Sequence, residues 1–98
     1  MRYRSRTDII GMVLQAAGRK EGATKTRLMY SAFLSYAQVK EYTDYLMEKG
    51  LVMLDRDTQL YRLTHKGLEF LNLYDRMNEL INSERGEELK AVTFDSTE

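Results

Sequence analysis

The stretch SYAQVKEYTDYLMEKG, residues 35–50, predicts one helix around which the rest of the chain is arranged. Ser35 is a favoured N-cap residue, and Gln38 three positions later completes a capping box in which each residue satisfies a backbone amide of the other. Gly50 provides a C-terminal stop, preceded by Lys49, whose charge suits the helix dipole. Helical spacing places four positions in one stripe for burial, namely Val39, Tyr42, Thr43 and Leu46.

Two shorter helical patterns precede this stretch, and each follows a threonine that can act as its N-cap. These expected elements are Thr7 with a helix over residues 8–17, and Thr24 with a helix over residues 25–31. The connector from the second helix to the third, residues 32–34, has no glycine, which is unusual for a turn between two such helices. We expect Phe33 and Leu34 to anchor this corner in the core.

A strand, a turn and a second strand follow the central helix, over residues 51–54, 55–58 and 59–63. The order helix, helix, helix, hairpin is that of a winged helix-turn-helix, a fold that is mainly α with a small β-hairpin (α+β). In this fold the third helix is the recognition helix and the hairpin is the wing. The sequence therefore predicts three helices plus a wing, followed by a C-terminal dimerisation helix.

The last helix is expected over residues 64–82, with Thr64 as its cap. This helix would be about 28 Å long, which is longer than a helix needs to be to cover a winged-helix core. Six apolar residues, several at the spacing of a coiled-coil seam, form the expected homodimer interface: Phe70, Leu73, Tyr74, Met77, Leu80 and Ile81. The alternative is that the same residues pack back on the first helix of their own chain.

The chain divides into four parts by these patterns. They are a basic N-terminal arm at residues 1–7, a winged helix-turn-helix domain at 8–63, the dimerisation helix at 64–82 and an acidic flexible tail at 83–98. The net charge is zero, but residues 1–40 carry eight basic and two acidic side chains, and the acidic excess lies in the remainder. This separation favours one surface that contacts phosphate and another kept away from it.

Composition excludes several classes of function. The chain has no cysteine and one histidine, so we expect no metal site, no disulfide and no cofactor. No glycine-rich phosphate loop or nucleophile motif occurs, which argues against an enzyme. No apolar run approaches the roughly 18 residues of a membrane span, and the N-terminus lacks a signal-peptide core. We expect no membrane partner and a cytoplasmic, nucleoid-associated protein.

Double-stranded DNA is the expected partner, because the N-terminal residues of a recognition helix contact base edges. Ala37 suits a thymine methyl group and Glu41 suits a cytosine amino group, whereas Ser35 and Gln38 are also explained by capping. Basic residues of the arm, the second helix and the wing tip suit phosphates. The complete expected DNA-binding set is Arg2, Arg4, Arg6, Lys25, Thr26, Arg27, Ser35, Tyr36, Ala37, Gln38, Lys40, Glu41 and Arg56.

Alternatives to a sequence-preferring regulator stay open. One is an architectural DNA-binding protein with little sequence preference, and another is a winged-helix module that binds a protein partner. Seven tyrosines also permit an aromatic pocket for a small-molecule effector. More often, however, the rings of such residues pack at the edge of the core while their hydroxyl groups contact water.

The stretch from Arg2 to about Ile81 resembles a family of small archaeal winged-helix DNA-binding proteins, and five segments carry the resemblance. They are RSRTDII at 4–10, GATKTRLMY at 22–30, LSYAQVKEY at 34–42, EKGLV at 48–52 and YRLTHKG at 61–67. The resemblance implies a transcriptional regulator that dimerises through its last helix, commonly as an antiparallel coiled coil. This chain departs from the longer-coil members in ending that helix early, in its acidic tail and in its neutral net charge.

Overall fold

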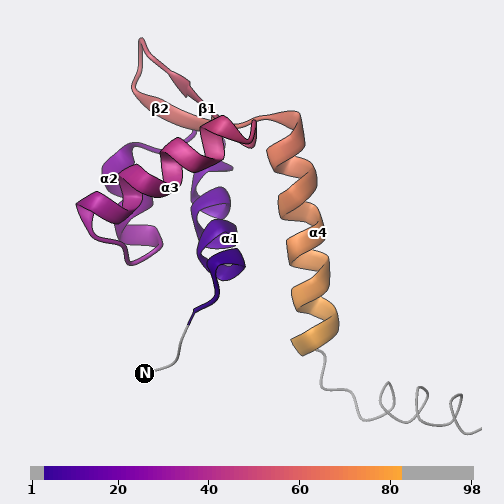
Figure 1. Cartoon of the computed structure of the whole chain (residues 1–98). Coiled ribbons are helices and arrows are strands. Elements are labelled where there is room, and N and C mark those ends of the chain that lie inside the picture. The colour runs from indigo at the N-terminus through magenta and orange to yellow at the C-terminus, as the bar shows by residue number, and fades with distance from the viewer. Residues whose placement is uncertain (1–3, 83–98) are drawn as a thin grey trace, which may run out of the picture.

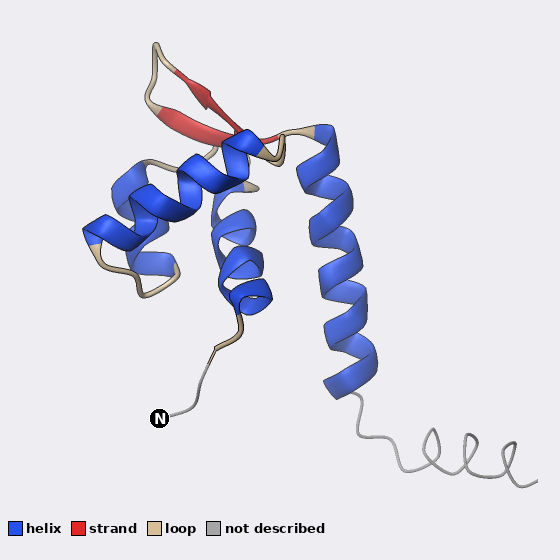
Figure 2. Ribbon diagram, viewed as in Figure 1, coloured by secondary structure: helices blue, strands red, loops and turns tan. Residues whose placement is uncertain are grey.

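The computed structural model describes residues 4–82 and has the predicted order of elements (Figures 1 and 2). These elements are α1 (Arg6–Ala17), α2 (Lys25–Ser31), α3 (Tyr36–Glu48), β1 (Val52–Asp55), β2 (Leu60–Leu63) and α4 (His65–Asn82). The winged helix-turn-helix prediction is confirmed. Arg2 and the expected acidic tail, residues 83–98, lie outside the described residues.

The predicted caps of α2, α3 and α4 are confirmed. In the capping box of α3, Gln38 N donates to Ser35 Oγ at 3.1 Å and Ser35 N donates to Gln38 Oε1 at 2.9 Å. The Thr24 and Thr64 hydroxyls accept hydrogen bonds from the third backbone amide after them, at 3.1 and 2.9 Å. Local side-chain chemistry therefore sets where these three helices begin.

The start of α1 corrects one prediction, because Ser5 and not Thr7 is the N-cap. Ser5 Oγ accepts from Asp8 N at 2.9 Å, and Asp8 Oδ2 accepts from Ser5 N at 3.2 Å. Three residues after Thr7 stands Ile10, which has no polar group to complete such a box. The reciprocal pair of Ser5 and Asp8 is more favourable than a cap by Thr7 because it satisfies two backbone amides. The helix therefore begins two residues earlier than expected.

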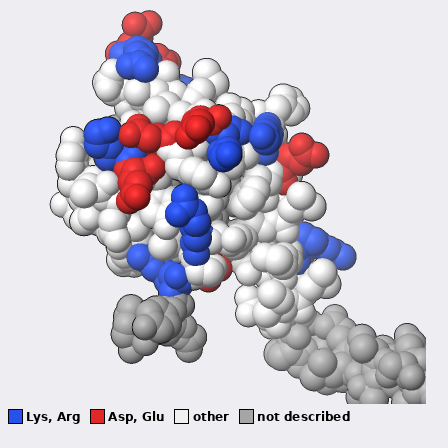
Figure 3. Space-filling view, viewed as in Figure 1, with Lys and Arg blue, Asp and Glu red and all other residues white. Residues whose placement is uncertain are grey.

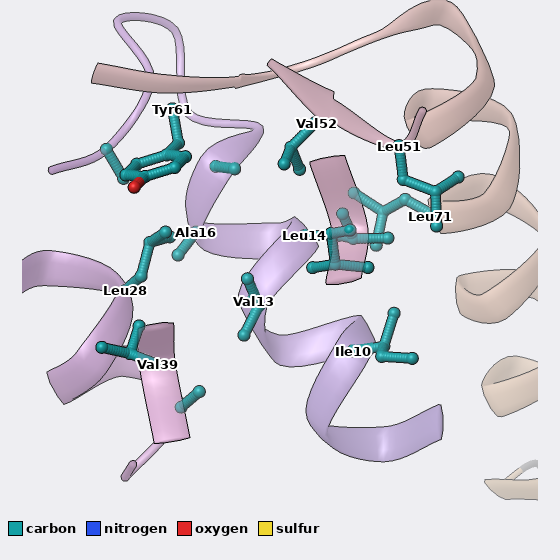
Figure 4. Close-up of a cluster of buried hydrophobic side chains, with 14 of the residues drawn as sticks. Ile10, Val13, Leu14, Ala16, Leu28, Val39, Leu51, Val52, Tyr61 and Leu71 are labelled. Atoms are coloured by element: carbon teal, nitrogen blue, oxygen red, sulfur yellow. The ribbon is translucent and has the colours of Figure 1, made fainter. Parts of the chain in front are cut away.

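The core lies where α1 passes between α3 and the start of α4. Val13 points towards Leu28 and Val39, and Leu14 faces the side of Leu51 and Leu71 (Figure 4). The buried stripe of α3 is confirmed for Val39, Thr43 and Leu46, and Tyr42 is half-buried. Burial of each large apolar side chain contributes about 1.5–3 kcal/mol before the entropy cost, so this cluster supplies the main stabilisation.

The wing is an antiparallel hairpin in which Val52 pairs with Leu63 and Asp55 with Leu60. Both strands begin one residue later than expected. For β2 the reason is that Gln59 takes a positive φ of 62° and belongs to the turn. An additional bridge joins Tyr61 to Ala23, with backbone hydrogen bonds of 2.7 and 3.0 Å. This bridge ties the base of the wing to the entrance of α2.

The turn between α2 and α3 corrects a second prediction. Leu34 is buried as expected, but Phe33 is 75% exposed and takes a left-handed conformation with φ of 56°. The chain must reverse sharply here, and this backbone conformation directs the Phe33 side chain away from the core. The Arg4 guanidinium donates to the carbonyl oxygens of Ala32 and Phe33 and lies over the Phe33 ring. Arg4 therefore stabilises a turn that lacks the usual glycine.

Replacing Phe33 with glycine is expected to stabilise the fold. A non-glycine residue in the left-handed region costs about 1–2 kcal/mol, and the lost Arg4 contact and added chain entropy offset part of that gain. We expect a net increase of about 0.5–1 kcal/mol in the free energy of unfolding, measured by urea denaturation. Tyr30→Gly, an exposed aromatic-to-glycine change inside α2, is the control and should destabilise. Equal destabilisation by both changes would contradict the strain argument.

The side of α4 that faces α1 packs on its own chain. Gly11 leaves room for the Tyr74 ring, because a Cβ atom there would lie 2.3 Å from Tyr74 Cε2. The Tyr74 hydroxyl donates to Asp8 Oδ1 at 3.0 Å. The Ser5 backbone amide first, and then this hydroxyl, hold the pKa of the Asp8 carboxyl below its ordinary value. Tyr74, which was predicted to lie at the dimer interface, is thus buried within its own protomer.

Candidate nucleic-acid interface

Helix α3 packs against the core with one face, and its opposite face is exposed to solvent. Its buried residues pack towards α1, α2 and the hairpin, whereas α4 stands on the other side of α1 (Figure 1). Four exposed residues, spaced four, three and four apart, line the outward face: Ala37, Glu41, Asp44 and Glu48. A helix held in this way presents a continuous ridge of the width that a DNA major groove admits.

The starts of α2 and α3 meet in one surface. The Lys25 ammonium lies 5.5 Å from the centre of the Tyr36 ring, and Tyr36 itself is 65% exposed. Thr26 and Arg27 are exposed beside them, and Arg27 borders a shallow hollow with Tyr30. The structure therefore brings together the expected phosphate contacts of α2 and the expected base contacts at the first turn of α3.

Lys40 is paired within α3. Its ammonium lies 3.0 Å from Asp44 Oδ2, and both side chains are more than half exposed. The hydrogen bond from Lys40 to Asp44, together with the charge of Asp44, raises the pKa of Lys40. Because exposed pairs of this kind are weak, a phosphate can replace Asp44 as the partner of Lys40.

The two described arginines of the expected arm contact their own protein. Arg4 binds the turn between α2 and α3, as described above. Arg6 opens α1, and its guanidinium lies 4.5 Å from the Tyr45 ring centre and 5.5 Å from that of Tyr42. Cation–π stacking of this kind holds the guanidinium over the side of α3. The tyrosines were visible in the sequence, but no local pattern connects them with Arg6.

At the wing tip, Arg56 is exposed between two aspartates. The Asp55 carboxylate accepts from the amides of Thr58 and Asp57, and these bonds lower the pKa of Asp55. Basic and acidic side chains stand together at this tip (Figure 3). Asp55 therefore shapes the turn that carries Arg56.

Acidic and basic side chains lie close together on the face that α3 presents (Figure 3). Ser35 and Gln38 already bond each other in the cap. The exposed acidic residues of α3 begin at its second turn, so its first turn is the part best suited to approach phosphates. The acidic residues of this row are three and four positions apart in the sequence, which places them on one face of the helix. Of these residues, only Glu41 was in the expected DNA-binding set.

Helix α4 also exposes several apolar residues. Leu73 is 68% exposed, and Phe70, Leu73, Tyr74 and Met77 border a hollow of about 220 Å³ with Thr7. Leu80 and Ile81 are exposed further along the helix. Tyr74 thus packs on α1 of its own chain, and the apolar residues beside it and further along α4 form an uncovered stripe.

Residues 4–82 contain no group of three histidine, aspartate or glutamate side chains placed to hold a metal ion. In the same part of the chain, no helix has the length and apolar character needed to span a bilayer.

Comparison with known proteins places this geometry in a family. A family model described as winged helix-turn-helix matches residues 3–82. No curated protein matches the chain. Among solved structures, Sso10a-2, a DNA-binding protein from Sulfolobus solfataricus, superposes with a TM-score of 0.68 at 20% identity, covering 96% of this chain and 94% of that one.

Two further solved structures are similar. The PcaV transcriptional regulator from Streptomyces coelicolor has a TM-score of 0.65 at 26% identity, covering 91% of this chain and 72% of its own. A point mutant of MepR from a multidrug-resistant S. aureus clinical isolate has a TM-score of 0.61 at 17% identity, covering 99% of this chain and 82% of its own. Together with the helical core, the hairpin and the open face of α3, the family match shows that this chain belongs to the winged helix-turn-helix family, whose fold is a DNA-binding fold.

Proposed function

We propose that the protein is a DNA-binding transcriptional regulator that acts as a homodimer. Helix α3 enters the major groove, and the wing and the start of α2 contact the backbone. The observation that carries this proposal is the open outward face of α3 beside the basic residues Lys25 and Arg27. A family member with its recognition helix uncovered and phosphate-binding groups at its edge has the parts that groove binding requires.

The start of α2 supplies the phosphate contacts in this proposal. Lys25 and Arg27 carry charge, and Thr26 carries a hydroxyl, on the first turn of the helix. Contacts of this type position a protein on a duplex without reading its sequence. Each cation that neutralises a phosphate releases a counterion, so the affinity falls as the salt concentration rises.

The apolar stripe on α4 supports the homodimer. Leu73, Leu80 and Ile81 are all more than 60% exposed, which is unfavourable for three large apolar side chains on one helix. A second copy that covers this stripe would place two recognition helices on one duplex, as paired half-sites require. The likeness to PcaV, which is described as a transcriptional regulator, supports the regulatory role.

Substitution of Arg27 tests the proposed DNA interface. Arg27→Gln is expected to weaken duplex binding about eightfold at 0.1 M salt and to reduce the salt slope by about 0.9, the value for one lost phosphate contact. Arg76→Gln is the matched control, because it removes the same charge from an exposed position on α4. Fluorescence anisotropy across a salt series measures both, and equal effects of the two changes would overturn the assigned interface.

Competition experiments separate the regulator from its alternatives. A genomic fragment containing a target site should resist displacement by excess scrambled duplex. Equal displacement by any duplex would favour an architectural protein, whose binding depends mainly on counterion release. Absence of binding at low salt would overturn the DNA proposal and favour a protein partner.

A further inference from the structure

The outward row of α3 contains three carboxylates in unequal surroundings. Asp44 is paired with Lys40, and Glu48 is the last residue of the helix. Glu41 lies one turn after Ala37 on the same face and is exposed. Within residues 4–82, no hydrogen bond or ion pair involves the Glu41 side chain. Glu41 is thus an unpaired acceptor near the leading end of the helix that we expect in the groove.

We propose that Glu41 is a specificity-determining residue that accepts a hydrogen bond from the 4-amino group of a cytosine in the major groove. This inference rests on the proposed DNA-binding function and deepens it. Ala37 occupies the preceding turn of the same face, and its short side chain allows the backbone to approach the base edges. A carboxylate one turn further on can then reach the floor of the groove, because a turn advances the helix by only about 5.4 Å.

The chemistry of base edges selects cytosine for a carboxylate. An ionised glutamate only accepts hydrogen bonds, so the acceptors N7 and O6 of guanine and O4 of thymine repel it. Adenine offers a donor at N6, but its N7 acceptor lies beside that donor and opposes the second carboxylate oxygen. Cytosine has no acceptor of its own on its major-groove edge, where the N4 donor lies beside C5–H, and it is therefore the base that Glu41 favours.

Charge near Glu41 makes this contact selective. A carboxylate in the groove faces the negative field of the backbone and loses water, which is unfavourable unless its hydrogen bond is made. Lys40 stands next to it, and Lys25 and Arg27 stand at the start of α2. These cations offset the general repulsion on every sequence, whereas only a cytosine satisfies Glu41, so a wrong base is rejected by an unpaired buried charge.

Selection from a randomised duplex library tests the assignment with a matched control. The wild-type protein should enrich C·G at one position in each half-site by about tenfold over other pairs. Glu41→Gln should lose this preference and favour adenine, which a glutamine amide binds through N6 and N7. Glu48→Gln removes the same charge from the same row and should strengthen binding to all duplexes without changing the preferred base.

Three results would overturn the assignment. The first is that Glu41→Gln selects the same sequence as the wild type. The second is that Glu48→Gln causes the same change of base preference as Glu41→Gln. In both cases duplex binding persists, so only the role of Glu41 fails. If the wild-type protein retains no duplex at low salt, the proposed function fails together with this inference. Thermal unfolding of both variants should match the wild type, because both residues are exposed.

Discussion

Replacing Gly67 with alanine should destabilise the protein by about 3 kcal/mol or more. Gly67 lies in the first turn of α4, where the helix crosses the entrance to the wing. A Cβ atom at this position would lie 1.9 Å from the carbonyl oxygen of Leu51 and 3.3 Å from Leu63 Cδ2. The nearest obstacle is backbone, which cannot rotate away, so α4 would have to move from the hairpin.

The direction of the stability change caused by Gly67→Ala distinguishes an effect of tertiary packing from an effect of helix propensity. Alanine is the better helix former by about 1 kcal/mol, so an exposed helix would be stabilised by the same change. Asn72→Ala, at an exposed position of α4, is the control and should leave stability unchanged or slightly raised. Thermal unfolding should place Gly67→Ala at least about 10 °C below the wild type. A melting temperature equal to that of the control would show that α4 is not held against Leu51.

Leu73→Glu should dissociate the proposed dimer. Leu73 is 68% exposed in the single chain and lies in the middle of the apolar stripe on α4. In an isolated protomer such a surface change would alter stability by less than about 0.5 kcal/mol. At a dimer interface it would remove a buried leucine and introduce an unpaired charge, at a cost of about 3 kcal/mol or more. The dissociation constant of the dimer should then rise by more than about a hundredfold.

Sedimentation equilibrium over a range of protein concentrations measures this shift directly. Asn72→Glu introduces the same charge at the neighbouring exposed position and should leave the dimer in place. Affinity for a site with two half-sites should fall with Leu73→Glu, since each protomer would bind alone. A wild-type protein that sediments as a monomer at all concentrations would contradict the dimer and leave the stripe on α4 for another partner.

Local signals in the chain specified most of the helix boundaries. Ser35 with Gln38, Thr24 and Thr64 each act through an amide three residues away, and such contacts are recognisable by spacing alone. The same rule explains the error at α1, where Thr7 was predicted as the cap and Ser5 is the observed one. Only Ser5 has a carboxylate, Asp8, at the position that completes the box.

Candidate DNA contacts were predictable to the extent that they lie on one helix. The 3.6-residue period separates the buried face of α3 from its open face, so Ala37, Lys40 and Glu41 were identified as exposed candidates. The pairing of Lys40 with Asp44 was not among the predictions, although a separation of four residues on a helix is a sequence signal for such a pair. Glu41 follows Lys40 directly in the sequence, and adjacent residues of a helix do not face each other, so its carboxylate stays unpaired.

Short-range spacing specified the order of the elements, the caps and the buried faces, because each depends on residues within one or two turns. Tertiary contacts decided where Arg4, Phe33 and Tyr74 lie. Arg4 binds carbonyls 28 and 29 residues away, and Tyr74 binds Asp8 across 66 residues. Such contacts exist only after the helices have packed, since packing sets which of many possible partners comes within reach. For that physical reason, two of the arginines expected on DNA, Arg4 and Arg6, and the tyrosine expected at the dimer interface, Tyr74, contact their own chain.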